Sequence, residues 1–379
     1  MIHRNLMTLL MLSAAFIGAC TIKWETSDPW NRTPAPDNRP APGQPDRSQP
    51  GGATRNADPQ HTPEVVQSPR AWPVLLTTMA VPESIEEDFD EMGVEKGFIM
   101  TQGAIDPKNT GRWSHPIYTE RWLDRVVPAD FDGFITLNWE GKAIGVLHDG
   151  PSHPEFEQTV DEWVRLIRFV REQRPRAYVG MYSLPIRQYW GQDEEWRRAA
   201  LAYKPILDAS SVIYPSVYDF YHRNPAGDHE RFGNIVELAL ELAEGKPVIL
   251  YTRHRYHPSN KVFPNRIIPR DEYVNHVRHL MNIEVDGQRP AGVVAWSNDM
   301  ALLRAPREHE PGEKPNPALE LLQKEMRPVE SRIEYLERVM RRVFCLLNEA
   351  VRDMPCESIP PGSEPSVHGD GPVTGSRGG

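Results

Sequence analysis

The sequence predicts an α/β fold of parallel strand–helix units, arranged as a distorted (β/α) barrel with about seven strands. Short apolar, β-rich runs alternate with longer amphipathic stretches from residue 71 to residue 328. Several of these runs end in polar or aromatic residues, which would converge on one mouth of a barrel. A doubly wound nucleotide-binding sheet would instead need a Gly-rich phosphate loop, and the sequence contains neither GxGxxG nor GxxxxGK[ST].

The expected strands are read from apolar runs, and the expected helices from apolar residues spaced three and four apart. We expect helices over 156–173, 235–244 and 271–283. The expected strands are 74–81, 97–101, 133–139, 177–184, 211–218, 247–252 and 291–297.

Composition excludes several classes of protein. The 379 residues are 39% hydrophobic and 25% charged, which is typical of a globular protein. The formal net charge of −10 argues against a nucleic-acid-binding function. No second long apolar run follows the N-terminus, so the sequence does not predict a multi-span membrane protein.

Residues 1–20 are typical of a bacterial lipoprotein signal peptide. His3 and Arg4 precede an apolar run, and Ile17-Gly18-Ala19-Cys20 places small residues before a cysteine. We expect lipidation, including palmitate, at Cys20, which would anchor the chain to a membrane of the cell envelope on its periplasmic or surface side. Plain secretion, with Cys20 unmodified, is the alternative.

The composition of two flanking segments predicts that they are disordered. Residues 21–70 contain ten prolines and almost no aliphatic residues, so they cannot bury enough apolar surface to fold. We expect an extended tether there, and a second disordered segment in the Gly-, Pro- and Ser-rich tail at 355–379.

The spacing of apolar residues over 329–354 predicts an amphipathic helix after the barrel. This helix either packs on the outside of the barrel or forms a coiled coil that drives self-association. Cys345 and Cys356 either form a disulfide in an oxidising compartment or remain separate, with Cys345 buried in the helix.

Glu140 is the most informative acidic residue. It follows the apolar run that ends at Asn138, and residues two apart on an extended segment point the same way. Aromatic neighbours such as Trp139, Tyr182, Tyr218 and Trp296 would desolvate its carboxyl and raise its pKa, which suits proton donation to a glycosidic oxygen. The alternative is a Glu held by backbone groups or by an Arg.

Other chemistries leave weaker signals. The sequence has no GxSxG, HExxH or CxxC motif, so we expect neither a hydrolase elbow nor a zinc site, and no cofactor. His254 and His257, near Arg253, Arg255 and Tyr256, are compatible with a metal site or with a solvated basic loop.

Four strand-end motifs, in order along the chain, resemble the hyaluronidase family of glycoside hydrolases, known from bee venom and mammals. Residues 131–140 (FDGFITLNWE) resemble the third strand of that family, and 212–218 (VIYPSVY) resemble the fifth. Residues 174–185 are similar to the fourth strand, and 291–297 (AGVVAWS) to the seventh. The resemblance covers roughly 72–327.

The resemblance implies a distorted barrel that cleaves a polysaccharide containing N-acetylhexosamine by a substrate-assisted, retaining mechanism. Glu140 would act as the acid and then the base, and Tyr218 would hydrogen-bond the reacting acetamido group. Tyr182 and Trp296 would line the sugar pocket, and Asp271 lies in a more loosely similar segment, 269–273.

One departure from the family motif leaves a second function open. The family has Asp where this chain has Asn138, and that Asp orients the acetamido group and stabilises the developing positive charge. The second reading is therefore a weakened or inactive carbohydrate-binding lipoprotein on the same barrel. A structural protein of the envelope is a third.

Basic residues could attract a polyanionic substrate, despite the net negative charge of the chain. The candidates for such a groove are Arg187, Arg253, Arg255, Lys261 and Arg266. Scattered, solvated charge is the alternative for these residues.

Overall fold

The computed structural model describes residues 70–188, 191–218, 225–260, 262–297, 299, 321 and 324–356. The predicted signal peptide with Cys20, the tether up to residue 69, Lys261 and the tail from 357 onwards lie outside the described residues.

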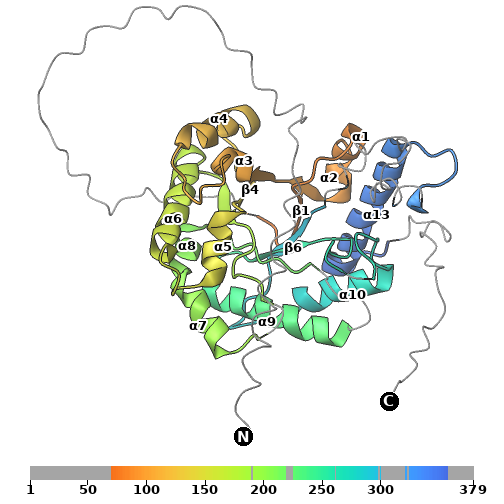
Figure 1. The fold of residues 1–379 in the computed structure, drawn as a ribbon. Helices are drawn as coiled ribbons and strands as arrows, with labels where there is room; N and C mark the ends of the chain where they lie inside the picture. Colours follow the sequence, from red (N-terminus) through yellow and green to blue (C-terminus); the bar gives the residue numbers. More distant parts are fainter. Residues whose placement is uncertain are drawn as a thin grey trace, which may run out of the picture. The chain divides into compact units, whose positions relative to one another are not determined.

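The described part is an α/β fold in which every pairing between named strands is parallel. The strands form a four-stranded sheet of order β2-β1-β7-β6 and a three-stranded sheet of order β3-β4-β5. Figure 1 shows the strands at the centre, with helices around them. Their bounds are β1 Val74–Thr77, β2 Val94–Lys96, β3 Phe98–Thr101, β4 Phe134–Asn138, β5 Tyr178–Met181, β6 Ile249–Thr252 and β7 Gly292–Ala295.

The two sheets enclose one buried cluster. Only Gly97 separates β2, in the first sheet, from β3, in the second. On the other side, isolated parallel bridges join Tyr214 to Tyr182 after β5, and Ser216 to Tyr251 of β6. Side chains from both sheets meet in an apolar cluster, namely Val74, Leu76, Phe134, Tyr178, Val212, Tyr214, Tyr218, Ile249, Tyr251 and Val294.

Two differences from the predicted strands have physical causes. Residues 211–218 form isolated bridges rather than a named strand, because Pro215 has no N–H to donate to a regular ladder. The short strand β2 was not predicted, since three residues are too few to show an alternating pattern.

The helices lie on the outside of the strands, with their apolar faces buried (Figure 1). The helix predicted over 156–173 coincides with α6, where Trp163, Leu166, Ile167 and Val170 are fully buried. The described helices are α1 Glu83–Glu86, α2 Phe89–Met92, α3 Gln102–Ile105, α4 Pro116–Val126, α5 Lys142–Asp149, α6 Phe156–Gln173, α7 Glu194–Ala202, α8 Lys204–Ala209, α9 Pro225–Ala243, α10 Arg270–Met281 and α13 Arg332–Arg352.

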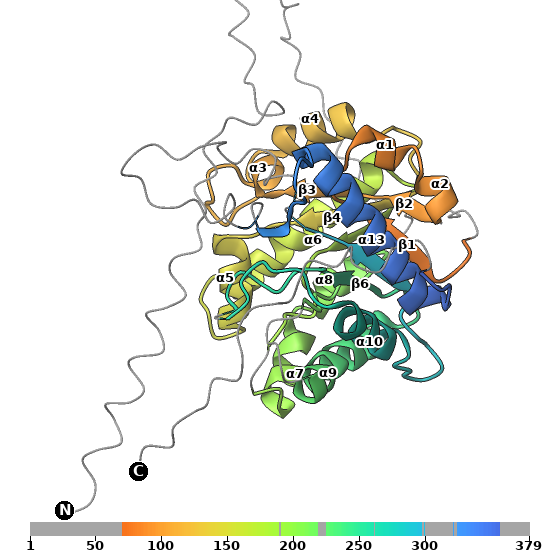
Figure 2. The same cartoon turned by 90° about the vertical axis from the view of Figure 1, so that its right-hand side faces the viewer.

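Helix α13 lies within the stretch predicted to be helical and packs against this same chain. It lies alongside α10 and β1 (Figure 2). Its N-terminus has a capping box between Ser331 and Glu334. Its apolar residues Leu336, Met340, Val343 and Leu347 are buried, whereas Ile333 is exposed. Of the two predicted arrangements, the helix therefore has the one in which it packs on the strands and helices of its own chain. Cys345 and Cys356 form a disulfide.

None of the helices in the described ranges combines the length and the apolar composition that crossing a bilayer requires.

Candidate functional site

Strand register brings Asn138 and Tyr182 together. Phe134, Thr136 and Asn138 alternate along β4, and the first two contribute to the interior between the sheets, where Thr136 accepts a hydrogen bond of 2.7 Å from the Tyr251 hydroxyl. The last β4–β5 pair is Leu137 with Met181, and the Tyr182 amide donates to the Leu137 carbonyl at 3.0 Å. Asn138 and Tyr182 are therefore neighbours at the carboxyl ends of their strands.

The register of the other sheet places Arg253 and Trp296 side by side at the carboxyl ends of β6 and β7. The last β6–β7 pair is Thr252 with Ala295, so Arg253 and Trp296 come next. The Arg253 guanidinium lies 5.7 Å from the centroid of the Trp296 ring. Tyr218 stacks on Trp296, with ring centroids 5.7 Å apart and planes at 12°. We call the set Asn138, Tyr182, Tyr218, Arg253 and Trp296 the upper layer.

Tyr218 is buried next to Tyr182. Its ring lies 6.2 Å from that of Tyr182, which packs edge-on at 4.9 Å against Tyr251 deeper in the interior. Burial, and then the neighbouring Tyr182, raise the pKa of Tyr218 well above its ordinary value. The phenol therefore stays protonated and can act as a donor at neutral pH.

A buried serine links the aromatic residues to a second cation. The Ser216 hydroxyl lies 3.1 Å from the Tyr182 hydroxyl and accepts a hydrogen bond of 3.0 Å from Arg187. Burial lowers the pKa of both Arg187 and Arg253. Two partly desolvated guanidinium groups next to the aromatic rings favour a ligand that carries negative charge or carbonyl oxygens.

Glu140 lies two residues beyond Asn138, and its neighbours in the chain fix the backbone there. Trp139 is buried and stacks on Trp163, with centroids 5.9 Å apart. Gly141 has a φ of 68°, and a Cβ on it would lie 2.1 Å from the side-chain oxygen of Asn109. That oxygen accepts a hydrogen bond of 2.8 Å from the Lys142 amide at the start of α5.

The carboxyl of Glu140 is available rather than buried. Its side chain is exposed and makes no hydrogen bond or ion pair within the described part of the chain. The predicted desolvation by aromatic neighbours is therefore wrong for the described residues, because Trp139 turns to the helix side, against Trp163. The alternative, a Glu held by backbone groups or by an Arg, is not found among the described residues either.

Asp271 does not join the upper layer. It lies in the first turn of α10, with its side chain 82% exposed and an ion pair of 2.9 Å to Arg270. Tyr273, two residues later, points inward and its hydroxyl lies 3.1 Å from the Thr252 hydroxyl. Residues two positions apart in a helix differ by about 200° around its axis. Since Tyr273 points inward, Asp271 points away from the strands.

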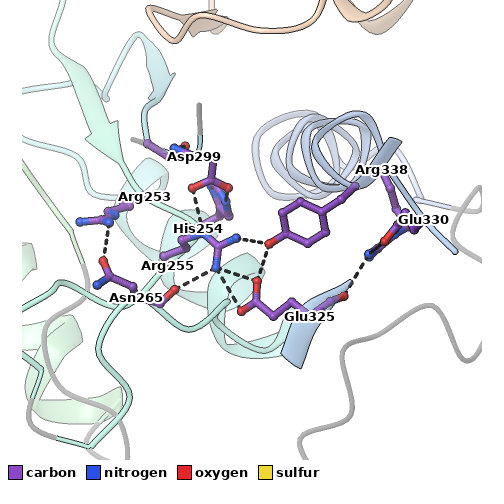
Figure 3. Close-up of polar contacts among 10 residues, drawn as sticks. Arg253, His254, Arg255, Asn265, Asp299, Glu325, Glu330 and Arg338 are labelled. Atoms are coloured by element: carbon purple, nitrogen blue, oxygen red, sulfur yellow. Dashed lines mark hydrogen bonds and ion pairs between the residues drawn. The ribbon is translucent and has the colours of Figure 1, made fainter. Parts of the chain in front are cut away.

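The segment after β6 is not a solvated basic loop. His254 and Arg255 are almost fully buried, and both contact Asp299, at 3.0 and 2.8 Å (Figure 3). Arg255 also pairs with Glu325 at 3.0 Å and donates to the Tyr335 hydroxyl of α13 at 2.7 Å. The prediction of solvated charge is wrong here because these charges are paired inside the protein.

Two described cavities lie away from the upper layer, at the amino ends of the strands. One of about 750 Å³ includes Trp72 and Ala291, and another of about 580 Å³ includes Arg70 and Gly133. Within the described ranges, no group of three or more His, Cys, Asp or Glu side chains is arranged to hold a metal ion.

The sequence analysis did not predict the roles of three residues. Ser216 and Tyr251 support the upper layer, and Asp299 belongs to the ion network around Arg255. Ser216 and Tyr251 hold Tyr182 in place through a hydroxyl contact and a ring contact. The alternation of Tyr214, Ser216 and Tyr218 was a signal for Ser216, since the three share one side of an extended segment. No local pattern predicted the partnership of Asp299 with a residue 44 positions earlier.

Two solved structures of bee venom hyaluronidase have folds similar to that of this chain. The monoclinic crystal form aligns with a TM-score of 0.49 and 13% identity, covering 60% of this chain and 92% of that one. The complex with a hyaluronic acid tetramer aligns with a TM-score of 0.47 and 14% identity, covering 60% and 90%. No protein-family model and no curated protein sequence matches this chain.

Proposed function

We propose that this chain is a glycoside hydrolase that cleaves a polysaccharide containing N-acetylhexosamine at the carboxyl ends of a distorted barrel with about seven strands. One observation carries the proposal: Asn138, Tyr182, Tyr218 and Trp296 share one layer, and Glu140, whose carboxyl has no partner among the described residues, follows two residues after Asn138. Flat aromatic rings suit the apolar faces of sugars, and a nearby carboxyl supplies a proton.

The proposed reaction is substrate-assisted and retains the anomeric configuration. The 2-acetamido oxygen attacks the anomeric carbon as the glycosidic C–O bond breaks, and protonated Glu140 gives its proton to the leaving oxygen. Glu140, now a carboxylate, then takes a proton from a water molecule that attacks the anomeric carbon and reopens the oxazolinium ring. The Tyr218 hydroxyl would hydrogen-bond the acetamido group during both steps.

The direct test is turnover by Glu140→Gln in the full-length chain. We expect release of reducing ends from amino-sugar polysaccharides to fall by about 10²–10⁴-fold, because glutamine cannot donate the proton. Glu157→Gln is the matched control: Glu157 is an exposed residue on α6 and its variant should keep the parent rate. Cleavage by Glu140→Gln at the parent rate would exclude the mechanism.

Asn138 favours a second candidate function, carbohydrate binding without turnover. A neutral amide at this position cannot offset the positive charge of an oxazolinium ion as a carboxylate would. If the parent binds amino-sugar oligosaccharides without cleaving them, Asn138→Asp should introduce measurable cleavage. If the parent cleaves them, the same variant should increase the rate about tenfold. If Asn138→Asp changes the cleavage rate in neither case, position 138 takes no part in the reaction.

The proposed place of action is a bacterial cell envelope, with the chain anchored through a lipid on Cys20. The Ile17-Gly18-Ala19-Cys20 sequence supports this proposal. Labelled palmitate should be incorporated into the parent and not into Cys20→Ala. Equal labelling of the two would remove the anchor from the account.

A further inference from the structure

The cavity of about 750 Å³ opens at the end of the strands opposite the upper layer. Trp72 and Pro73, before β1, and Ala291, before β7, form its floor, while Asn282 after α10 and Val351 of α13 form part of its walls. Its volume lies in the range of small-molecule binding sites.

Trp72 presents a large aromatic ring at this cavity. Its side chain is 42% exposed, although tryptophan is usually well buried in folded proteins. The indole packs edge-on against Phe134, with centroids 6.3 Å apart, and against Tyr178, with centroids 6.2 Å apart, so two buried rings hold its orientation. A ring that is both exposed and held in place is a ready stacking surface.

The interior that separates this cavity from the upper layer is filled. Tyr251 packs edge-on against Tyr214 at 5.6 Å and against Tyr182 at 4.9 Å, midway along the strands. Tyr214 and Tyr251 are fully buried. A ligand at Trp72 therefore cannot reach Tyr218 or Trp296 through the interior, and the two places are separate sites.

The charges that line the cavity balance one another, with two cations, Arg278 and Arg289, and two anions, Asp286 and Asp353. Arg278 lies 3.6 Å from the Asp353 carboxylate and donates to the Glu349 carbonyl at 3.1 Å. Arg289 pairs with Glu284 at 2.8 Å. Since each guanidinium has an acid nearby, the cavity offers no net charge to select an ion, and an uncharged ligand fits it better.

Two amide side chains supply acceptors for hydroxyl groups. The Asn282 amide nitrogen donates to the Arg278 carbonyl at 2.9 Å, and that of Gln288 donates to the Lys246 carbonyl at 2.7 Å. These bonds fix both amides, while their oxygens accept no hydrogen bond from the described residues. Fixed acceptors beside an aromatic platform match a ligand that combines hydroxyl donors with an apolar face.

From this combination we infer a second ligand site, in which a neutral oligosaccharide stacks on Trp72 and donates hydroxyl hydrogen bonds to Asn282 and Gln288. The inference does not rest on the proposed hydrolase activity, since it concerns the opposite end of the strands and needs no chemical step.

The test is titration of the full-length chain with cellotetraose, a neutral oligosaccharide without acetamido groups, by calorimetry. Parent and Trp296→Ala should bind it saturably with the same affinity. Trp72→Ala should bind it at least about tenfold more weakly, and Trp72→Phe, which keeps a ring on Phe134 and Tyr178, within about threefold of the parent. Equal affinity in Trp72→Ala, or loss in Trp296→Ala instead, would overturn the inference.

Asn282→Leu provides a second variant in case Trp72→Ala does not fold. Asn282 is exposed, so this change leaves the core intact, and it should weaken cellotetraose binding about threefold. Maltotetraose, which also lacks acetamido groups, extends the probe set. Failure of both oligosaccharides to bind the parent saturably overturns the second site and leaves the proposed hydrolase, which is judged by the turnover of Glu140→Gln, untouched.

Discussion

Two carboxyl groups follow strands of the two different sheets and have opposite surroundings. Glu140, two residues after β4, is exposed and makes no ion pair or hydrogen bond within the described ranges. Asp299, four residues after β7, is 2% exposed and contacts both His254 and Arg255. The carboxylate of Asp299 is therefore used in ion pairs that hold the fold together, whereas the carboxyl of Glu140 is accessible to a ligand.

The surroundings of Asp299 keep its carboxyl ionised and paired. Burial alone would raise the pKa of this carboxyl, but the charges of Arg255 and His254 outweigh burial and hold the pKa far below its usual range. Because Arg255 also contacts Glu325 and Tyr335, the same ion network ties the segment after β6 to α13 (Figure 3).

The largest expected effect is on stability, at Asp299. Asp299→Asn removes the charge and leaves Arg255 buried with Glu325 as its remaining anion, so the free energy of unfolding should fall by about 3 kcal/mol. Urea unfolding measures this. Asp271→Asn, at an exposed residue, is the control and should stay within about 0.5 kcal/mol of the parent. Equal losses in the two variants would contradict the network account.

Acid should destabilise the protein through a buried histidine behind the upper layer. His276 donates to the Val217 carbonyl at 3.1 Å, and burial lowers its pKa to about 4. The unfolded chain takes up this proton near pH 6.5, so stability is complete above that pH and falls as the pH drops towards 4, by up to about 3 kcal/mol.

Melting curves of the parent and of His276→Gln between pH 7.5 and 4.5 test this. Glutamine keeps a donor for the Val217 carbonyl and does not titrate, so the variant should lose less stability over that interval. Parallel curves for the two proteins would show that His276 does not carry the pH dependence.

A smaller effect is expected at Gly141, which sets the direction of Glu140. Gly141→Ala places a Cβ against Asn109 at a φ that L-residues rarely adopt, so we expect a loss of about 1–3 kcal/mol, accompanied by reduced turnover. Gly145→Ala is the matched control, because Gly145 lies within α5 with open space at its Cβ and alanine favours a helix there. If Gly141→Ala behaves like Gly145→Ala, the turn does not position the carboxyl.

Much of the fold could be predicted from local patterns. Strands fully buried on both sides, such as β6 and β7, read as apolar runs, and α6 shows its buried stripe at helical spacing. Tyr182, Tyr218 and Trp296 could be placed together because each follows a parallel strand or an extended segment, and such ends meet at one edge.

The remaining features depend on partners that are distant in the sequence. Arg255 resembles other surface arginines until Asp299, Glu325 and Tyr335 surround it. The exposure of Glu140 depends on Trp139 finding Trp163, and the outward direction of Asp271 follows from the phase of α10. The spacing of residues within a single segment does not show which distant residues will contact one another.

The central proposal is that Glu140 takes part in the reaction, whereas Asp299 stabilises the fold. The most direct measurement is turnover per folded molecule of an amino-sugar polysaccharide, together with the melting temperature, for Glu140→Gln and Asp299→Asn. We predict that Glu140→Gln keeps the melting temperature of the parent and loses turnover, whereas Asp299→Asn melts earlier and keeps turnover where it is folded. The reverse pattern, with Glu140→Gln active or unstable, would contradict the account.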